Sequence, residues 1–320
     1  MRRSVYIFFL CVFLGACGRS ADLPPHEVLK RTARASQELS SARFFLLAIP
    51  RWEYGATAGE LTFNIDGRLQ HGGDQIQFLA SVQGDIRGPG GETTSLTSAF
   101  EVIVSGPEEL YLNVHTLESQ PPLLAFQSLS LAELVGKWLQ LSAPVSAISA
   151  SSSMAPDPHL LKMQSEIVDI VRDRGQEMHS GRSRYHYDVR LNTEKLLTFV
   201  EEVSRVREES LDTTMLKTFL AFVNAEGELF IDAETFLIER LVWHISAPHV
   251  PFGAFSLDLT LDLKDHGKAP PILPPLDATP FPSAALIPVN MGALSTGDLL
   301  PELTPSIEEE IQSVMMDTEP

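Results

Sequence analysis

Hydrophobic and polar residues alternate along much of the chain, which predicts strands rather than helices. The clearest case is residues 74–84, DQIQFLASVQG, in which every second residue from Ile76 to Val82 is hydrophobic. This period of two is typical of a strand with one buried face. Glycine-rich turns such as 88–91 separate neighbouring runs, so we expect antiparallel pairing. The other expected strands are 42–49, 59–69, 97–104, 109–115, 137–141, 184–191, 226–232, 237–246 and 254–265.

Helical spacing, with hydrophobic residues three or four positions apart, interrupts this pattern in a few places. A first helix is expected at 26–41, directly after two prolines that suit a helix start. Asn192 or Thr193 can cap a later helix. The other helices are expected at 157–173, 194–207 and 211–222. They come late in the chain, among the last strands.

The N-terminus has the features of a bacterial lipoprotein signal peptide, which we assign to residues 1–16. Two arginines precede ten uncharged residues, VYIFFLCVFL. A helix of that length is about 15 Å long, half the hydrocarbon core of a bilayer, so it is too short to span. Leu14, Gly15, Ala16 and Cys17 then resemble a lipobox, at which the cysteine receives diacylglycerol and becomes the first residue. The alternative is an ordinary signal peptide cleaved near Ala16.

Composition and charge exclude several classes of protein. The chain has 24 basic and 42 acidic residues, a net charge of -18, which argues against nucleic-acid binding. Cleavage before Cys17 would leave a single, acylated cysteine, so neither a disulfide nor cysteine catalysis is expected. A membrane partner through the lipid anchor, on the exported side of the cell envelope, is expected instead.

The C-terminal segment, residues 269–320, differs from the rest of the chain. It holds ten prolines and eight acidic residues but no lysine or arginine. Such a composition predicts a mostly disordered tail. The domain organisation is therefore a signal peptide at 1–16, a tether at 17–25, a folded domain at 26–268 and the tail.

No motif predicts catalysis. The nine histidines show no common zinc-binding spacing, and no nucleophile elbow of the form G-x-S-x-G occurs. The glycines of 88–91 lack the lysine of a phosphate-binding loop. Calcium binding by the acidic residues of 228–232 is an alternative. We therefore expect no catalytic residue, no metal site and no cofactor.

Three stretches resemble the LolA/LppX family of bacterial lipoprotein and lipid carriers. They are 109–115 followed by Gly136-Lys137-Trp138-Leu139-Gln140-Leu141, then YHYDVRLNTE at 185–194, and the hairpin at 227–245. The resemblance implies an α+β fold in which a curved antiparallel sheet, a partial β-barrel, is closed by helices around an apolar cavity. The implied ligands are acyl chains. The chain departs from LolA in carrying its own anchor, and its tail matches nothing in the family.

Two hypotheses follow from the resemblance and the hydrophobic pattern. In the first, the protein is a non-catalytic, membrane-anchored carrier that holds acyl chains in the cavity. In the second, the core is filled, and the lipoprotein has a structural or regulatory role in which residues 269–320 contact an envelope protein. The candidates for cavity-lining residues are Ile76, Phe78, Val102, Leu112, Trp138, Phe199, Phe219 and Trp243.

Overall fold

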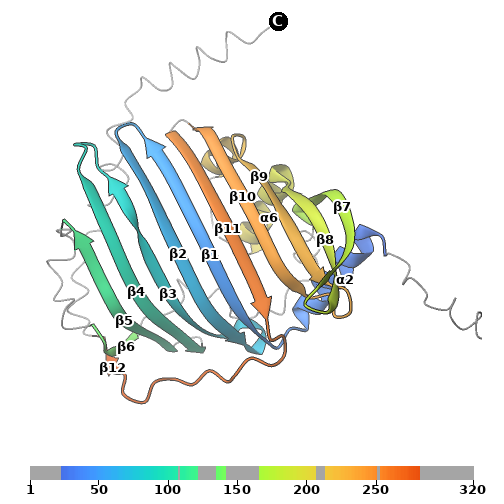
Figure 1. The fold of residues 1–320 in the computed structure, drawn as a ribbon, viewed down its shortest axis with the longest axis horizontal. Helices are drawn as coiled ribbons and strands as arrows, with labels where there is room; N and C mark the ends of the chain where they lie inside the picture. Colours follow the sequence, from blue (N-terminus) through green and yellow to red (C-terminus); the bar gives the residue numbers. More distant parts are fainter. Residues whose placement is uncertain are drawn as a thin grey trace, which may run out of the picture. The chain divides into compact units, whose positions relative to one another are not determined.

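The main feature of the computed structural model is a single sheet of twelve strands (Figure 1). The structure describes residues 23–106, 109–121, 135–141, 166–206, 213–250 and 253–281. The predicted signal peptide, the lipobox and Cys17 lie outside the described residues. The strands are β1 (Ser41–Tyr54), β2 (Thr57–Gln70), β3 (Gln75–Arg87), β4 (Thr93–Gly106), β5 (Glu109–Gln120), β6 (Trp138–Leu141), β7 (Val168–His179), β8 (Arg182–Leu191), β9 (Asn224–Asp232), β10 (Ile238–Val250), β11 (Gly253–Lys264) and β12 (Thr279–Pro280).

The strand order β12-β6-β5-β4-β3-β2-β1-β11-β10-β9-β8-β7 joins two meanders at the middle of the sheet. The chain begins at the centre with β1, and each strand up to β6 pairs antiparallel with the one before it. It resumes at the opposite edge with β7 and returns to β11, which pairs with β1. Because β12 and β7 are edges, the sheet stays open. The predicted fold class, α+β with a curved and unclosed antiparallel sheet, is confirmed.

The two faces of the sheet differ in polarity. Directly opposed residues on paired strands share a face, so a row of side chains can be followed across the sheet. One row from β5 to β8 consists of Val114, Phe100, Ala80, Ile65, Leu46, Leu261, Leu241, Leu229 and Tyr187. No member of the row is charged, and we call this side the apolar face. The other side, which carries Arg51, Glu60 and Asp258, is the polar face.

Helix α2 (Pro25–Gln37) covers the apolar face at the β8–β9 end. Its Val28 is fully buried in a cluster with Tyr187, Val189 and Ile231, among others. Helices α6 (Thr193–Val206) and α7 (Thr213–Leu220) follow β8. Three of the expected helices are thus confirmed. None of the helices that the structure describes is long and apolar enough to cross a bilayer.

The cap of α6 is Asn192, one of the two residues that the sequence offered. The backbone N–H of Lys195 donates to Asn192 Oδ1 over 3.0 Å. This bond satisfies one of the free N–H groups in the first turn of the helix. Short-range chemistry therefore sets where β8 ends and α6 begins.

The expected helix at 157–173 is wrong in its described part. Residues from Val168 onward form β7, which pairs antiparallel with β8. Val168 and Ile170 pack against the buried cluster under α2, whereas Asp169 and Val171 are exposed. The hydrophobic residues at this spacing fit either a helix or a strand, and pairing with β8 decides between them.

Residues 269–279, at the start of the C-terminal segment, lie against the polar face. Ile272 is 4% exposed and packs with Ile103 and Tyr111 in a second small core cluster. Gln70 Nε2 donates to the carbonyl oxygen of Pro270 over 2.8 Å, which fixes the start of the segment. We call residues 269–279 the strap. The strap is part of the same compact unit as the strands before it.

A glycine near the end of β2 allows an aromatic ring to lie on the sheet. Gly67 is opposite Phe44 of β1, and a Cβ atom at Gly67 would overlap the Phe44 ring. The same Cβ would come within 2.7 Å of the carbonyl oxygen of Gln77 on β3. Cross-strand pairing of an aromatic residue with a glycine is a known device for stabilising sheets.

Substituting Gly67→Ala is therefore expected to destabilise the fold by about 1–3 kcal/mol, the usual range for overpacking. The free energy of unfolding in urea measures this effect. Gly106→Ala is the matched control, because a Cβ at that strand end would meet nothing within 4 Å. Equal stability of the two variants would show that the ring moves aside without cost.

Candidate functional site

The apolar face is the most extensive feature that could bind a ligand. In β1–β4 and β8–β11 no residue whose register places it on this face is charged. Nine strands at a spacing of about 4.8 Å make a row of about 38 Å. Most of its large side chains in the middle of the sheet, such as Phe44, Ile65 and Leu261, are only half-buried. Among the described residues, the face is thus a broad hydrocarbon surface whose central side chains stay partly accessible.

Four of the eight candidate cavity residues lie together on this face. Phe78, Val102 and Leu112 are directly opposed on β3, β4 and β5. Ile76 is two residues from Phe78 on β3 and shares its face. Trp243 is on the same face but on β10, which is separated from β3 by β2, β1 and β11. The prediction therefore identified two separate parts of one surface.

The other three candidates lie elsewhere. Trp138 is opposed to Asn113 and packs against the Ile103, Tyr111 and Ile272 cluster on the polar face, so it does not line the apolar face. Phe199 is half-buried on α6. Phe219 on α7 is 36% exposed. Strand β6 has only four residues, so its alternation was too short to predict which face Trp138 lies on.

The centre of the apolar face, above all β11, was missing from the candidate set. Phe255, Leu257, Leu259 and Leu261 on β11 alternate with polar residues and lie in the centre of the surface. The signal that could have found them is the alternation in GAFSLDLTLDLK, which is as regular as that of β3. What the sequence lacks is the pairing of β11 with β1, which joins the two halves.

The polar face carries ion pairs across neighbouring strands. Arg51 donates from Nε to Glu60 on β2 and from Nη1 to Asp258 on β11, each over 2.6 Å. His244 on β10 is 2.6 Å from the second oxygen of Asp258. The hydrogen bond from Arg51, and then that from His244, lowers the pKa of Asp258. These exposed pairs suit a face turned to water.

One pocket of about 640 Å³ lies where β1, β3 and β10 end and β2, β4 and β11 begin. Trp52, Phe255, Pro248 and charged residues including Arg51 and Glu60 line it. None of the eight candidate cavity residues lines this pocket. Its mixture of ion pairs and aromatic rings differs from the uniform hydrocarbon of the apolar face.

Comparison with known proteins yields solved structures only. No family model matches the chain, and no curated protein is similar in sequence. The lipoprotein LppX of Mycobacterium tuberculosis is 10% identical with a TM-score of 0.36, over 78% of this chain and 100% of that one. LprF of Mycobacterium bovis is 12% identical with a TM-score of 0.37, over 81% and 100%.

A DUF1329 family protein from Desulfovibrio piger is 10% identical with a TM-score of 0.22, over 76% of this chain and 92% of that one. LppX is one of the proteins after which the family that the sequence resembles is named. At such identities and TM-scores, the ligand of one protein does not indicate the ligand of another. The function of this protein is therefore inferred from its own residues.

Proposed function

We propose that this protein is a membrane-anchored lipoprotein of the cell envelope that binds acyl chains on the apolar face and catalyses no reaction. The single observation that carries the proposal is the uncharged row of hydrophobic side chains from Val114 on β5 to Tyr187 on β8. Contiguous apolar patches on monomers rarely exceed a few hundred Å², and larger ones mark binding surfaces.

Acyl chains suit this surface because they need no polar partner. Each buried CH₂ group contributes about 0.8 kcal/mol, and a long flat face can bury many of them at once. A water-soluble ligand would need hydrogen-bonding groups at fixed positions. The apolar face offers almost none, since its rows hold mainly Leu, Ile, Val and Phe.

The polar face explains how such a surface stays in solution. Its ion pairs, together with the net charge of -18, keep one side of the sheet hydrated. The proposed lipid on Cys17 would keep the other side near a bilayer, where acyl chains are abundant. Anchor and surface together are typical of a protein that shelters acyl chains beside a membrane.

Native mass spectrometry tests the proposal on a chain that begins at Gly18 and is exported by a signal peptide without a lipobox. Without the anchor, the protein can be purified free of detergent. We expect it to carry bound lipid of acyl-chain mass, and to take up a fluorescent fatty acid saturably once stripped. A preparation with no bound lipid and no uptake would exclude the proposed function. Lipid binding that survives deletion of residues 282–320 would separate it from a role of the tail in protein contacts.

A further inference from the structure

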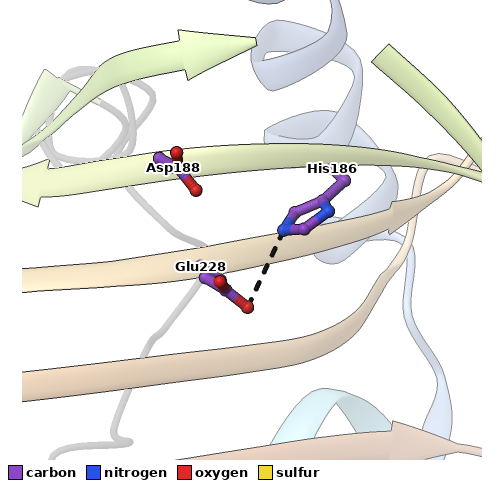
Figure 2. A group of neighbouring side chains, drawn as sticks. All are labelled: His186, Asp188 and Glu228. Atoms are coloured by element: carbon purple, nitrogen blue, oxygen red, sulfur yellow. Dashed lines mark ion pairs between the residues drawn. The ribbon is translucent and has the colours of Figure 1, made fainter. Parts of the chain in front are cut away.

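A group of chemically different side chains lies on the polar face at the other end of the sheet, among β7, β8 and β9. His186 and Asp188 are two residues apart on β8, and Glu228 is directly opposite Asp188 on β9. One ligand atom from each lies within 4.8 Å of the others. Figure 2 shows the imidazole and the Glu228 carboxylate turned toward one another.

His186 is held in a fixed orientation. It is only 8% exposed, and its ring stacks on Phe230 with 4.1 Å between ring centroids. Its Nδ1 atom is 3.4 Å from Glu177 Oε2. A carboxylate at one ring nitrogen favours the tautomer with the proton there and leaves the other nitrogen with a free lone pair.

The other ring nitrogen, Nε2, is buried and has no hydrogen-bond partner. Glu228 Oε2 is 3.7 Å away, beyond hydrogen-bonding distance. A buried polar atom without a partner is costly and calls for an explanation. Two ligands with bonds of about 2.1 Å to a tetrahedral zinc ion are roughly 3.4 Å apart. The distance of 3.7 Å between His186 Nε2 and Glu228 Oε2 is close to that value.

Arginines surround the carboxylates. Arg174 Nε donates to Asp188 Oδ1 over 2.7 Å, and its Nη2 is 3.7 Å from Glu228 Oε1. Arg172 Nε is 3.8 Å from Asp188 Oδ2. Arg184 pairs with Glu177 and lies over the Phe230 ring. Glu228 Oε2 faces the imidazole. A cation between these two groups would compete chiefly with Arg174 for the carboxylates of Asp188 and Glu228.

We propose that His186, Asp188 and Glu228 bind one divalent transition-metal ion, for which zinc fits best. An imidazole nitrogen with two carboxylate oxygens is a ligand set that zinc accepts, and three protein ligands leave one position open. Glu177 would orient the imidazole from outside the ligand set. The site lies on the polar face and does not depend on acyl-chain binding.

Isothermal titration calorimetry with zinc chloride, on the tag-free full-length protein in detergent, tests the site. One zinc ion per chain is expected. Glu228→Gln removes a ligand from a side chain that is 40% exposed, so folding is preserved, and should weaken binding at least about tenfold. Glu226→Gln is the matched control on the same strand and face, where Glu226 pairs with Arg190 at 2.9 Å. It should leave the zinc affinity unchanged.

Arg174→Ala gives a change in the opposite direction. Removal of the competing guanidinium should tighten zinc binding several-fold, whereas a purely structural cluster would gain no affinity from it. Two results would overturn the proposal. One is the absence of any saturable zinc binding. The other is equal affinity in the wild type and Glu228→Gln, which would place the bound zinc at other histidines.

Discussion

Replacing Phe78 by asparagine should weaken acyl-chain binding by about ten- to a hundredfold, whereas Leu79→Asn should leave it unchanged. Phe78 and Leu79 are neighbours on β3, but they lie on opposite faces of the sheet. Phe78 is opposed to Gly67 and Val102 on the apolar face, beside the Phe44 ring. Leu79 lies between Asp66 and Glu101 and is 47% exposed.

The expected loss of affinity follows from the free energy of burying one Phe side chain against an acyl chain. Loss of a buried Phe contact removes about 1.5–3 kcal/mol, and an amide against hydrocarbon adds a desolvation cost. Each 1.4 kcal/mol corresponds to a factor of ten in affinity. Titration of a fluorescent fatty acid, with the free energy of unfolding measured for both variants, separates lost binding from lost folding. Equal binding by Phe78→Asn and Leu79→Asn would show that acyl chains do not contact this face. As a further control, Phe78→Leu should retain binding, because it keeps a hydrophobic side chain there.

Replacing Cys17 by serine should move nearly all of the protein from the membrane to the soluble fraction. The proposed anchor places acyl chains on this thiol, and with about 0.8 kcal/mol per buried CH₂ two chains suffice for stable attachment. Serine cannot form the thioether. Incorporation of labelled palmitate, together with flotation on a density gradient, measures the effect.

The other cysteine of the chain supplies the control for the anchor. Cys11 lies within the uncharged run of the expected signal peptide, where Phe9 and Leu10 precede it in place of small residues. Cys11→Ser should therefore keep both the palmitate label and membrane attachment. An unlabelled wild-type protein, whose first residue is something other than modified Cys17, would contradict the assignment.

Local patterns were enough to predict most of the fold. The alternation in residues 74–84 predicted β3 and correctly placed Ile76 and Phe78 on one face, because a strand's period is two. The patterns failed where pairing with a neighbouring strand decides the outcome. Residues from Val168 onward are a strand because β8 pairs with them, and Trp138 faces the strap because β6 pairs with β5 in that register.

The candidate metal site illustrates the same limit. His186 and Asp188 have the two-residue spacing of one strand face, which every alternating strand of this chain also produces, so the spacing alone does not single them out. Glu228 becomes their neighbour only through the pairing of β8 with β9. The burial of Ile272 could not be read from the sequence for another reason: Ile272 and Leu273 form a short hydrophobic stretch among prolines, and composition averages over so few residues.

The pairing of β1 with β11 at the centre of the sheet has a consequence for how the chain is made. Phe44 and Leu263 are direct partners although more than two hundred residues separate them. In the exported protein that we propose, the first meander would leave the export channel long before β11 could cover its inner edge, and such distant pairings form slowly. During that interval an unpaired hydrophobic strand is open to aggregation. We expect safe biogenesis to require an envelope chaperone that shields β1 until synthesis is nearly complete.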